Sequence, residues 1–203
     1  MQQLNREICE FIGAFIGDGF LGKYDRSYVV GLAGDSRLDY EYLAEHMQKL
    51  LLRNFSGIRP HIYVRSDENS MALKVYSKNF FGYMCSLGFS PGRKSRTVTI
   101  PKEIMCRHEF MSATVRGIFD TDGCVYWGKR SSYAKPYPRI TLQVASQPLI
   151  RQLQQFLERD FWLYVNLRNR DGKRNYLEIY GHEQYKRFLK EIGFSNIRHA
   201  SVA

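Results

Sequence analysis

Two aspartates in this chain lie near the end of similar sequence motifs. Asp18 closes the stretch FIGAFIGDG and Asp122 closes VRGIFDTDG, and in both an apolar run with an inner glycine ends on Asp-Gly. The two stretches lie about half a chain length apart in a protein of 203 residues. One Asp-Gly after an apolar helix is most often a helix stop or a hairpin turn. Two copies at equivalent positions of a duplicated unit indicate instead a pair of acids with a shared task.

The chemistry open to two neighbouring carboxylates depends on what neutralises them. Held together without a cation, they repel and raise each other's pKa. Oxygen ligands of this kind suit Mg²⁺, which keeps several waters and favours phosphate oxygens. The chain carries 30 Lys and Arg against 20 Asp and Glu, a net charge of +10 that favours a polyanionic partner. Paired acids with Mg²⁺ in a basic protein therefore predict the hydrolysis of a phosphodiester.

The sequence disfavours several other classes of protein. Basic charge alone fits RNA, DNA or an anionic membrane, but charged residues interrupt the apolar stretches, and none approaches the ~18 residues of a membrane span. The four cysteines form no CxxC pair and have no histidine at zinc-ligand spacing. The N-terminus MQQLNREICEF lacks the basic and apolar regions of a signal peptide. We expect an intracellular protein, in the cytoplasm of a prokaryote or in an organelle, with no membrane partner.

Periodicity places each Asp-Gly at the end of a helix and repeats one order of elements. Apolar residues from Leu4 to Ile16 have helical spacing, and strand-like runs follow around YVVGLAG, IRPHIYVR and MALKVY, with a helix between the first and the second. The second half repeats this order from a helix near His108 to a last helix at HEQYKRFLKEIGFS. ALKVY aligns with YLEIY, and SLGFSPGRKS with EIGFSNIRHA. The prediction is an α+β fold of two α-β-β-α-β-β-α repeats, residues 1–98 and 99–203.

Small residues indicate how the two repeats meet. Gly13 and Gly17 are four residues apart and share one face of the first helix. Ala113, Gly117 and Thr121 have the same spacing in the second repeat. Such faces let two helix backbones approach closely. If the helices pack there around a pseudo-twofold axis, both Asp-Gly pairs converge at the base of the helix pair.

The pair FIGAFIGDG and VRGIFDTDG resembles the two signature stretches of the LAGLIDADG homing endonucleases. The repeated order of elements, which covers nearly all of the chain, resembles the single-chain, two-repeat members of that family. The resemblance implies two curved antiparallel sheets that form a DNA-binding saddle. It also implies that the last acid of each signature, Asp18 or Asp122, binds metal, together with the backbone carbonyls of Gly17 and Thr121.

Further site residues follow from the same resemblance. The earlier acid of the signature, which is not usually the essential ligand, matches Asp120 in the second copy and Ile16 in the first. The family places basic and polar residues around its metals, where they organise water and stabilise the charged transition state. Their counterparts here are Lys94 in SPGRKS and His199 in SNIRHA. Many members also carry a glutamine near the end of the second strand of each repeat, where this chain has LAGDS and QVASQ.

Alternation in the strands predicts a DNA-binding face. The apolar residues of RITLQVA lie on one face and its polar residues on the other, and in HIYVR the side chains of Ile62 and Val64 oppose a polar face. An ordinary solvated sheet face is the alternative, but these faces are rich in the residue types that read base edges and contact phosphates. The expected DNA contacts are His61, Tyr63, Arg65, Lys74, Tyr76, Arg139, Thr141, Gln143, Asn166, Arg168 and Arg170.

These observations together predict a site-specific double-strand DNA endonuclease that acts as a monomer. The resemblance implies Mg²⁺ as the cofactor, with Mn²⁺ or Ca²⁺ able to substitute for binding. It implies a long pseudo-palindromic or asymmetric double-stranded target, with one half read by each repeat. The chain starts at Met1 and ends without the terminal His-Asn of an intein, so we expect an intron-encoded enzyme. Two alternatives stay open: an RNA-splicing maturase of the same fold, or a catalytically silent DNA-binding regulator.

Overall fold

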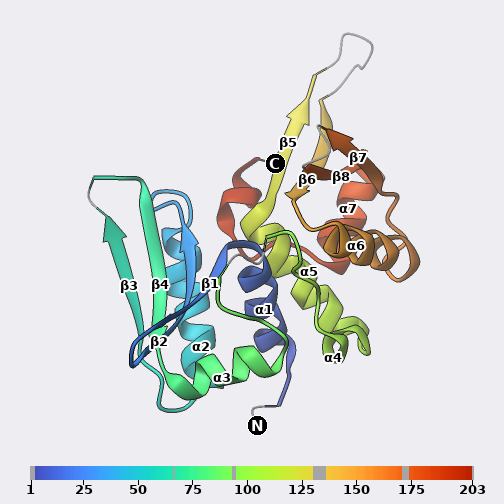
Figure 1. The fold of residues 1–203 in the computed structure, drawn as a ribbon. Coiled ribbons are helices and arrows are strands. Elements are labelled where there is room, and N and C mark those ends of the chain that lie inside the picture. Colours follow the sequence, from blue (N-terminus) through green and yellow to red (C-terminus); the bar gives the residue numbers. More distant parts are fainter. Residues whose placement is uncertain (1–2, 66, 93–94, 130–135, 171–173, 203) are drawn as a thin grey trace.

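The computed structural model describes residues 3–65, 67–92, 95–129, 136–170 and 174–202. In the first half, a long helix leads into two strands, a helical segment, two more strands and a further helix (Figure 1). The bounds are α1 Arg6–Asp18, β1 Gly19–Tyr24, β2 Ser27–Gly34, a π-helical segment Tyr42–Met47 that continues as α2 Gln48–Asn54, β3 Pro60–Arg65, β4 Ser70–Tyr76 and α3 Lys78–Ser86.

The second half repeats this order after one short helix. Its elements are α4 Lys102–Met105, α5 His108–Asp122, β5 Gly123–Gly128, β6 Tyr137–Val144, α6 Gln147–Arg159, β7 Asn166–Arg170, β8 Arg174–Tyr180, α7 His182–Glu191 and a 3₁₀ segment Ile197–Val202. The predicted α+β fold with a repeated α-β-β-α-β-β-α order is confirmed. The sequence pattern predicts neither the π-helical segment nor the 3₁₀ segment.

Each half forms its own four-stranded antiparallel sheet. The strand orders are β1-β2-β4-β3 and β5-β6-β8-β7, so the two sheets have the same topology. Their registers also correspond, because His61 faces Lys74 between β3 and β4, and Asn166 faces Glu178 between β7 and β8. Helices α2 and α3 pack on the first sheet, and α6 and α7 pack on the second (Figure 1). Each sheet therefore has one covered face and one open face.

The covered faces of the sheets belong to one continuous hydrophobic core. Alternate residues of β4 and β6 are buried, as the period-two pattern predicts, and Leu73 of β4 and Leu177 of β8 belong to the same core. Val64 of β3 lies on the same face, as predicted, because its register partner is the buried Met71. It is nevertheless 53% exposed, since β3 is the outer strand of its sheet and Val64 lies near its end.

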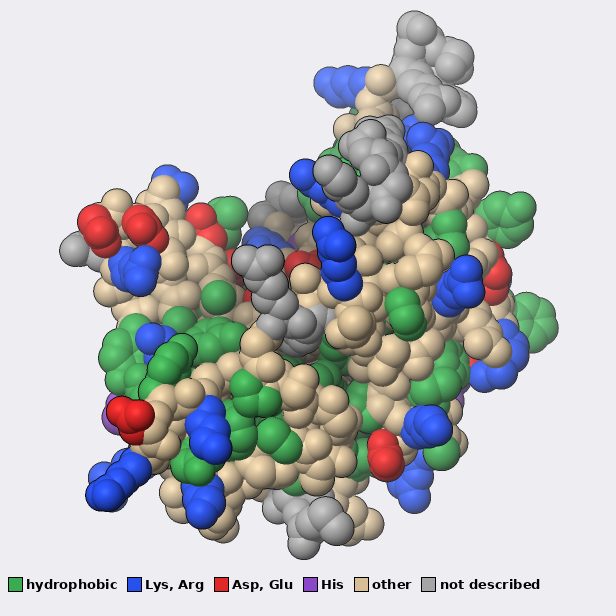
Figure 2. All heavy atoms as spheres, viewed as in Figure 1, with side chains coloured by type: hydrophobic (Ala, Val, Ile, Leu, Met, Phe, Trp, Pro, Cys, Tyr) green, Lys and Arg blue, Asp and Glu red, His purple; other side chains and the backbone are tan. Residues whose placement is uncertain are grey.

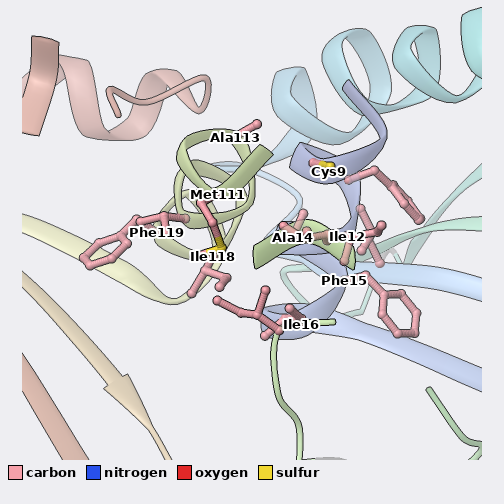
Figure 3. Packing of buried hydrophobic residues seen from close by; sticks show 14 of the residues in the cluster. Cys9, Ile12, Ala14, Phe15, Ile16, Met111, Ala113, Ile118 and Phe119 are labelled. Atoms are coloured by element: carbon pink, nitrogen blue, oxygen red, sulfur yellow. The ribbon is translucent and has the colours of Figure 1, made fainter. Parts of the chain in front are cut away.

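Helix α1 begins at an asparagine cap and is then buried on nearly every side. The Asn5 side chain accepts the N–H of Ile8 at 2.9 Å, which satisfies one of the free donors of the first turn. Every residue from Ile8 to Ile16 is buried, because α5 covers one side and the first sheet and its helices cover the rest (Figure 3). Among the described segments, none of the helices combines the length and apolar content that crossing a bilayer requires.

Helices α1 and α5 meet through glycines, as their small-residue faces predict. A β-carbon on Gly13 would lie 2.0 Å from the carbonyl oxygen of Thr114. A β-carbon on Gly117 would lie 2.1 Å from the carbonyl oxygen of Glu10. Side chains at these two positions would therefore collide with backbone atoms, which cannot move aside. The two contacts are equivalent across the repeats, so the helix pair has pseudo-twofold symmetry.

A buried acid adds a polar contact between the repeats. Glu10 of α1 is 6% exposed, hydrogen-bonds Nε2 of His46 at 2.6 Å and lies 3.4 Å from Nη1 of Arg116. Arg116 also donates from Nε to the carbonyl oxygen of Ile192 at 2.7 Å. Burial alone would raise the pKa of Glu10, but the bond to His46 and the charge of Arg116 bring it below its ordinary value. The bond to Glu10 in turn raises the pKa of His46.

Candidate metal and DNA-binding site

The two Asp-Gly pairs mark the ends of α1 and α5. Asp18 and Asp122 are the last helical residues, and the glycine that follows each donates its N–H to a carbonyl oxygen of the last turn. A β-carbon at Gly19 or Gly123 would lie 2.4 Å or 2.3 Å from that oxygen. Only glycine fits where the chain passes directly from the helix into β1 or β5. The local backbone geometry thus explains why Gly19 and Gly123 are glycines. It does not explain why an aspartate precedes each of them.

The two helix ends lie together at the pseudo-twofold axis. A β-carbon on Gly17 would lie 2.1 Å from Oγ1 of Thr121 and 3.2 Å from Oδ2 of Asp122. Gly17 and Thr121 are equivalent residues, and equivalent residues can touch only close to the axis that relates them. The next residues, Asp18 and Asp122, therefore flank the axis, and both are half-buried. The structure brings the four residues predicted around the metal to one place.

The donors at this place suit a hard divalent cation. Two carboxylates and the neighbouring backbone carbonyls are all oxygen ligands, the type that Mg²⁺, Mn²⁺ and Ca²⁺ take. In the described part of the chain, no group of three or more His, Cys, Asp or Glu side chains could hold a metal. Mg²⁺ needs no such cage, since it keeps several waters and binds through one or two carboxylates plus substrate phosphates. The residues therefore fit an ion whose shell is completed by DNA.

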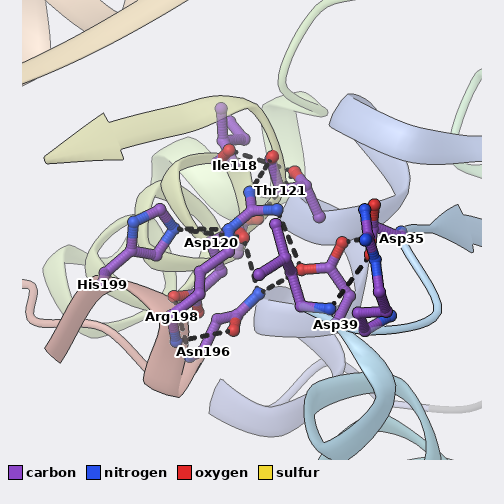
Figure 4. A network of polar contacts seen from close by, with 11 residues as sticks. Asp35, Asp39, Ile118, Asp120, Thr121, Asn196, Arg198 and His199 are labelled. Atoms are coloured by element: carbon purple, nitrogen blue, oxygen red, sulfur yellow. Dashed lines mark hydrogen bonds and ion pairs between the residues drawn. The ribbon is translucent and has the colours of Figure 1, made fainter. Parts of the chain in front are cut away.

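Arg198 reaches this place from the end of the chain, and sequence reasoning missed it. Its Nη1 lies 2.8 Å from Oδ1 of Asp39 in the first repeat, and its Nη2 donates to the carbonyl oxygen of Thr121 in the second (Figure 4). The Arg198 and Asp39 side chains are 20% and 8% exposed. The guanidinium thus joins the two repeats and engages one of the carbonyls predicted to contribute to the metal site. No local pattern could reveal contacts between residues so distant in the sequence.

Asp120, the earlier acid of the second signature, is fully buried and holds a loop. Its Oδ1 accepts the N–H of Ser195 at 3.1 Å and the N–H of Asn196 at 3.0 Å (Figure 4). Burial raises the pKa of Asp120 to about 7, although these two bonds act in the opposite direction. Its counterpart in the first repeat is the buried Ile16. The repeats therefore do not share this acid, and its contacts position the loop that leads to Arg198.

His199 lies under this network, away from any open face. It is 3% exposed, the centre of its ring lies 4.6 Å from that of the tilted Phe194 ring, and its Nε2 lies 3.4 Å from the carbonyl oxygen of Asp120. Burial lowers the pKa of His199 to about 4, and the charge of Arg198 adds to this shift. A neutral, enclosed imidazole is poorly placed to order water around a metal. The geometry thus argues against the predicted catalytic role and indicates a packing role.

The remaining residues that are expected near the metal are Lys94 and the residues of LAGDS and QVASQ. Lys94 lies outside the described residues. In LAGDS, the carboxylate of Asp35 accepts two backbone N–H groups of the following turn, which lowers its pKa. In QVASQ, Ser146 is fully buried, caps α6 and donates to the carbonyl oxygen of Val98 at 2.6 Å. Asp35 and Ser146 therefore serve local structure, and neither takes the place of the family's glutamine.

A pocket of about 320 Å³ opens beside Asp122. Gly17 and Asp122 line it on the side of the metal site, and Gln143 of β6 and Arg174 of β8 line it on the side of the second sheet. The pocket connects a predicted metal ligand to a predicted DNA contact. Arg174, which the sequence pattern does not single out, adds a cation to the lining of the pocket beside Asp122.

The predicted DNA contacts of the first repeat share the open face of their sheet. His61 and Lys74 are register partners, and alternation puts Tyr63, Arg65 and Tyr76 on the same side. All five are exposed or half-buried. Nζ of Lys74 lies 4.6 Å from the centre of the Tyr63 ring, and a hydrogen bond with Tyr76 raises the pKa of Tyr63. This face combines one lysine and one arginine with the edge-on ring pair of His61 and Tyr63.

The predicted contacts of the second repeat also share an open face. The register aligns Thr141, Glu178 and Asn166 across β6, β8 and β7, so these residues point the same way. Arg139 on this face lies 6.0 Å over the ring of Tyr126. The predicted contacts here are Arg139, Thr141, Gln143, Asn166, Arg168 and Arg170, of which the Arg170 side chain lies outside the described part. Figure 2 shows the surface hollowed between the two lobes, with Lys and Arg side chains at its margins.

Comparison with known proteins finds a family model that matches the second half of the chain. Residues 109–193 match the model of a LAGLIDADG-like domain, and this range contains the second Asp-Gly pair and the whole second sheet. The first half has the same topology and register and ends its first helix on the same Asp-Gly. The second half of the chain thus matches the LAGLIDADG-like domain, and the first half repeats its fold. Asp122 lies within the matched range, and Asp18 is its structural counterpart in the first half.

Two relatives contain a segment similar to nearly all of this chain. The replication factor C small subunit of Methanocaldococcus jannaschii is 31% identical over 199 residues, 96% of this chain and 10% of the relative. The tRNA-splicing ligase RtcB of Methanopyrus kandleri is 27% identical over 216 residues, 92% of this chain and 20% of the relative. The chain thus spans a tenth and a fifth of the length of these relatives.

Solved structures show the same fold. The homing endonuclease I-DmoI in complex with DNA and Mn has a TM-score of 0.66 and 14% identity, covering 93% of this chain and 96% of that chain. I-WcaI bound to its DNA recognition sequence has a TM-score of 0.62 and 13% identity, covering 100% and 88%. DUF199/WhiA from Thermatoga maritima has a TM-score of 0.62 and 15% identity, covering 100% and 60%. At these identities the likeness concerns the fold.

Proposed function

We propose that this protein is a site-specific DNA endonuclease that binds as a monomer and cuts both strands with a divalent metal at Asp18 and Asp122. The observation that carries the proposal is the meeting of the two signature ends on the pseudo-twofold axis, where Gly17 touches Thr121 and Asp122. One acid from each repeat is what a symmetric cut of two antiparallel strands requires. The solved relatives I-DmoI and I-WcaI, which are complexes with DNA, support this reading.

The residues of the chain would divide the reaction between them. Asp18 and Asp122, with the carbonyls of Gly17 and Thr121, would hold Mg²⁺, which supplies charge neutralisation at the phosphate and lowers the pKa of a bound water. Arg174 would contact a phosphate in the pocket beside Asp122. The open faces of the two sheets would follow the major groove on either side. Binding by many phosphate contacts also requires an affinity that falls steeply with salt.

The relatives support a self-contained and transferable module. Segments similar to this chain occur in a replication factor subunit and in an RNA ligase, and they form a small part of each. Two proteins named for such different tasks would not share a segment because of those tasks. A module that enters unrelated host genes fits an enzyme that cuts DNA at one site, as a homing endonuclease does. Because these segments lie inside the polypeptides of both relatives, they favour the intein-associated type over the intron-encoded type that the sequence analysis expects.

A DNA-binding protein without cleavage is the second candidate. The similarity to DUF199/WhiA shows that the fold is not confined to proteins named as endonucleases. The half-buried, paired acids favour cleavage, because a purely binding protein gains nothing from two carboxylates held next to DNA phosphates. The distinction therefore depends on catalysis and not on binding.

One experiment separates the two candidates. A plasmid library with randomised inserts of roughly 20 bp, two helical turns of DNA, is incubated with the protein and either Mg²⁺ or EDTA, and the cut ends are sequenced. The endonuclease reading predicts cuts at one motif with Mg²⁺ and none with EDTA. Enrichment of a motif by binding, without cuts in Mg²⁺ or Mn²⁺, would select the second candidate. Binding without any motif would contradict both.

A further inference from the structure

One position of the two sheets carries opposite charges in the two repeats. Lys74 is the third residue of ALKVY in β4, and Glu178 is the third residue of YLEIY in β8. The register confirms that they are equivalent, because Lys74 faces His61 and Glu178 faces Asn166 on the neighbouring outer strand. Both point to the open face, since the residues on either side of each are buried in the core. The chain thus places a largely buried carboxylate beneath an open face that carries Arg139 and Arg168.

Each of these residues contacts a second pair of equivalent residues. Nζ of Lys74 lies 4.6 Å from the ring centre of Tyr63, two residues after His61 on β3. Oε2 of Glu178 lies 3.3 Å from Nε of Arg168, two residues after Asn166 on β7. In each repeat, the residue on the inner strand contacts the outer-strand residue two positions beyond its register partner. This diagonal contact is a cation–π contact in the first repeat and an ion pair in the second.

The exposure of the ion pair shows which partner faces outward. The Glu178 side chain is 11% exposed and that of Arg168 is 51% exposed. Oε2 of Glu178 is buried and has no hydrogen-bond partner within the described part of the chain, so its 3.3 Å contact with Nε of Arg168 is an ion pair without a hydrogen bond. The carboxylate therefore lies beneath the guanidinium and attracts it by its charge. A carboxylate in this place weakens the attraction to phosphates, so it needs a compensating role.

We propose that Glu178 is a positioning residue for DNA recognition, which holds Arg168 so that its guanidinium reads a guanine in the half-site bound by the second sheet. The inference rests on the proposed DNA-binding function. Arginine reads guanine by two parallel hydrogen bonds to O6 and N7, which demands a fixed orientation. The charge of the carboxylate beside Nε favours one orientation of the guanidinium and leaves the terminal nitrogens for the base. Lysine has no planar guanidinium that could donate two parallel hydrogen bonds. The equivalent contact of Lys74 with Tyr63 in the first sheet therefore reads the other half-site differently.

The test is a selection of preferred sites from a random double-stranded library, without cleavage, in Ca²⁺ at one fixed salt concentration. Wild type should prefer guanine at one position of one half-site. Arg168→Ala should reduce that preference by about 5- to 150-fold, the range for loss of a good bidentate contact. Glu178→Gln, which keeps the shape and removes the charge, should reduce the preference at the same position and at no other. A role in stability alone would not move the preference at a single base pair.

A matched control removes an equal charge elsewhere. Glu183 of α7 is 84% exposed, pairs with Lys186 at 3.1 Å and lies on the covered side of the sheet. Glu183→Gln should raise the affinity for all sequences slightly, as should Glu178→Gln, but it should leave every base preference unchanged.

The outcomes separate this inference from the function on which it rests. An unchanged preference in Glu178→Gln overturns the positioning role and leaves sequence-specific binding intact. A change at a position that Arg168→Ala does not affect also overturns it, since Glu178 would then read a base itself, as a carboxylate can read cytosine. No sequence preference in wild type would overturn the proposed DNA-binding function and the inference together.

Discussion

Gly13 of α1 and Gly117 of α5 occupy equivalent places in the two repeats, and each brings its own backbone against a carbonyl oxygen of the other helix. The contact occurs twice around one axis, so it fixes both the distance and the rotation of the helix pair. The same axis passes between Gly17 and Thr121 at the helix ends. The separation of Asp18 and Asp122 thus depends on glycines more than a helical turn away.

The first prediction concerns these glycines. Gly13→Ala or Gly117→Ala should lower the free energy of unfolding by more than the ~1–3 kcal/mol typical of overpacking, because the new β-carbon would meet backbone and not a movable side chain. Leucine should cost more. Gly82→Ala in α3 is the matched control, since a β-carbon there meets nothing within 4 Å. Urea denaturation measures all variants, and normal stability in both interface variants would show that the helices do not pack this way.

The second prediction concerns the link from Arg198 to Asp39. Arg198→Ala should destabilise the protein by about 3–5 kcal/mol, because it leaves the buried carboxylate of Asp39 without its ion pair. Asp39→Asn should cost less in the Arg198→Ala background than in wild type, with a coupling of about 0.5–3 kcal/mol. Arg37→Ala, at an exposed pair 3.9 Å long, should cost at most about 1 kcal/mol. Additive effects of the first two substitutions would mean that the link contributes nothing.

The third prediction is a pH dependence that comes from His46. The hydrogen bond to Glu10 raises the pKa of His46 above 6.5, so the folded protein keeps a proton that the unfolded chain releases. This stabilisation is complete below pH 6.5 and is lost as the pH rises through the folded-state pKa. The loss should stay below about 1.4 kcal/mol per pH unit, because 36% of the side chain is exposed and solvent screens it.

Denaturation curves at several pH values test the assignment to His46. His46→Gln and Glu10→Gln should each flatten the profile in this window, since each removes one partner of the bond. A slope that persists unchanged in both variants would assign the dependence to other groups.

The fourth prediction is that the half-sites differ and are read separately. The protein should bind as a monomer to roughly 20 bp, and Arg139→Ala should relax the preference only in the half bound by the second sheet, by about 1–3 kcal/mol if Arg139 reads a guanine. Site selection with wild type and variant, together with the mass of the complex, provides the measurement. A palindromic site bound by a dimer would contradict the account.

The sequence predicts much of the fold because periodicity and duplication reinforce each other. Helical spacing and alternation place the strands and helices in order, and the small-residue spacing around Gly13 and Gly117 predicts how the repeats meet. The sequence predicts the register of the sheets less well than the order of the elements. ALKVY and YLEIY align as repeats, but the contacts of Lys74 and Glu178 with the outer strands follow only from the paired structure.

The candidate site is predicted in part, for a physical reason. Asp18 and Asp122 lie at ends of elements, where a local motif and a tertiary position coincide. His199 and Arg198 are adjacent in sequence, yet one is enclosed under Phe194 and the other reaches Asp39 and Thr121. Which of two neighbours points to the site depends on the 3₁₀ turn that carries them, and the sequence pattern does not predict that turn.

The central claim is that Asp18 and Asp122 form one paired metal site for cleavage. The most direct test measures cutting of a plasmid with the selected site in Mg²⁺, and binding of the same site in Ca²⁺, for Asp18→Asn and Asp122→Asn. Asp25→Asn is the matched control, in an exposed turn where Asn tolerates the left-handed backbone of φ 46. The account predicts that each site variant loses double-strand cutting by at least about 100-fold and keeps its binding, because Asn is a poor Mg²⁺ ligand of nearly the same shape. Double-strand cutting at the wild-type rate by either variant would contradict it.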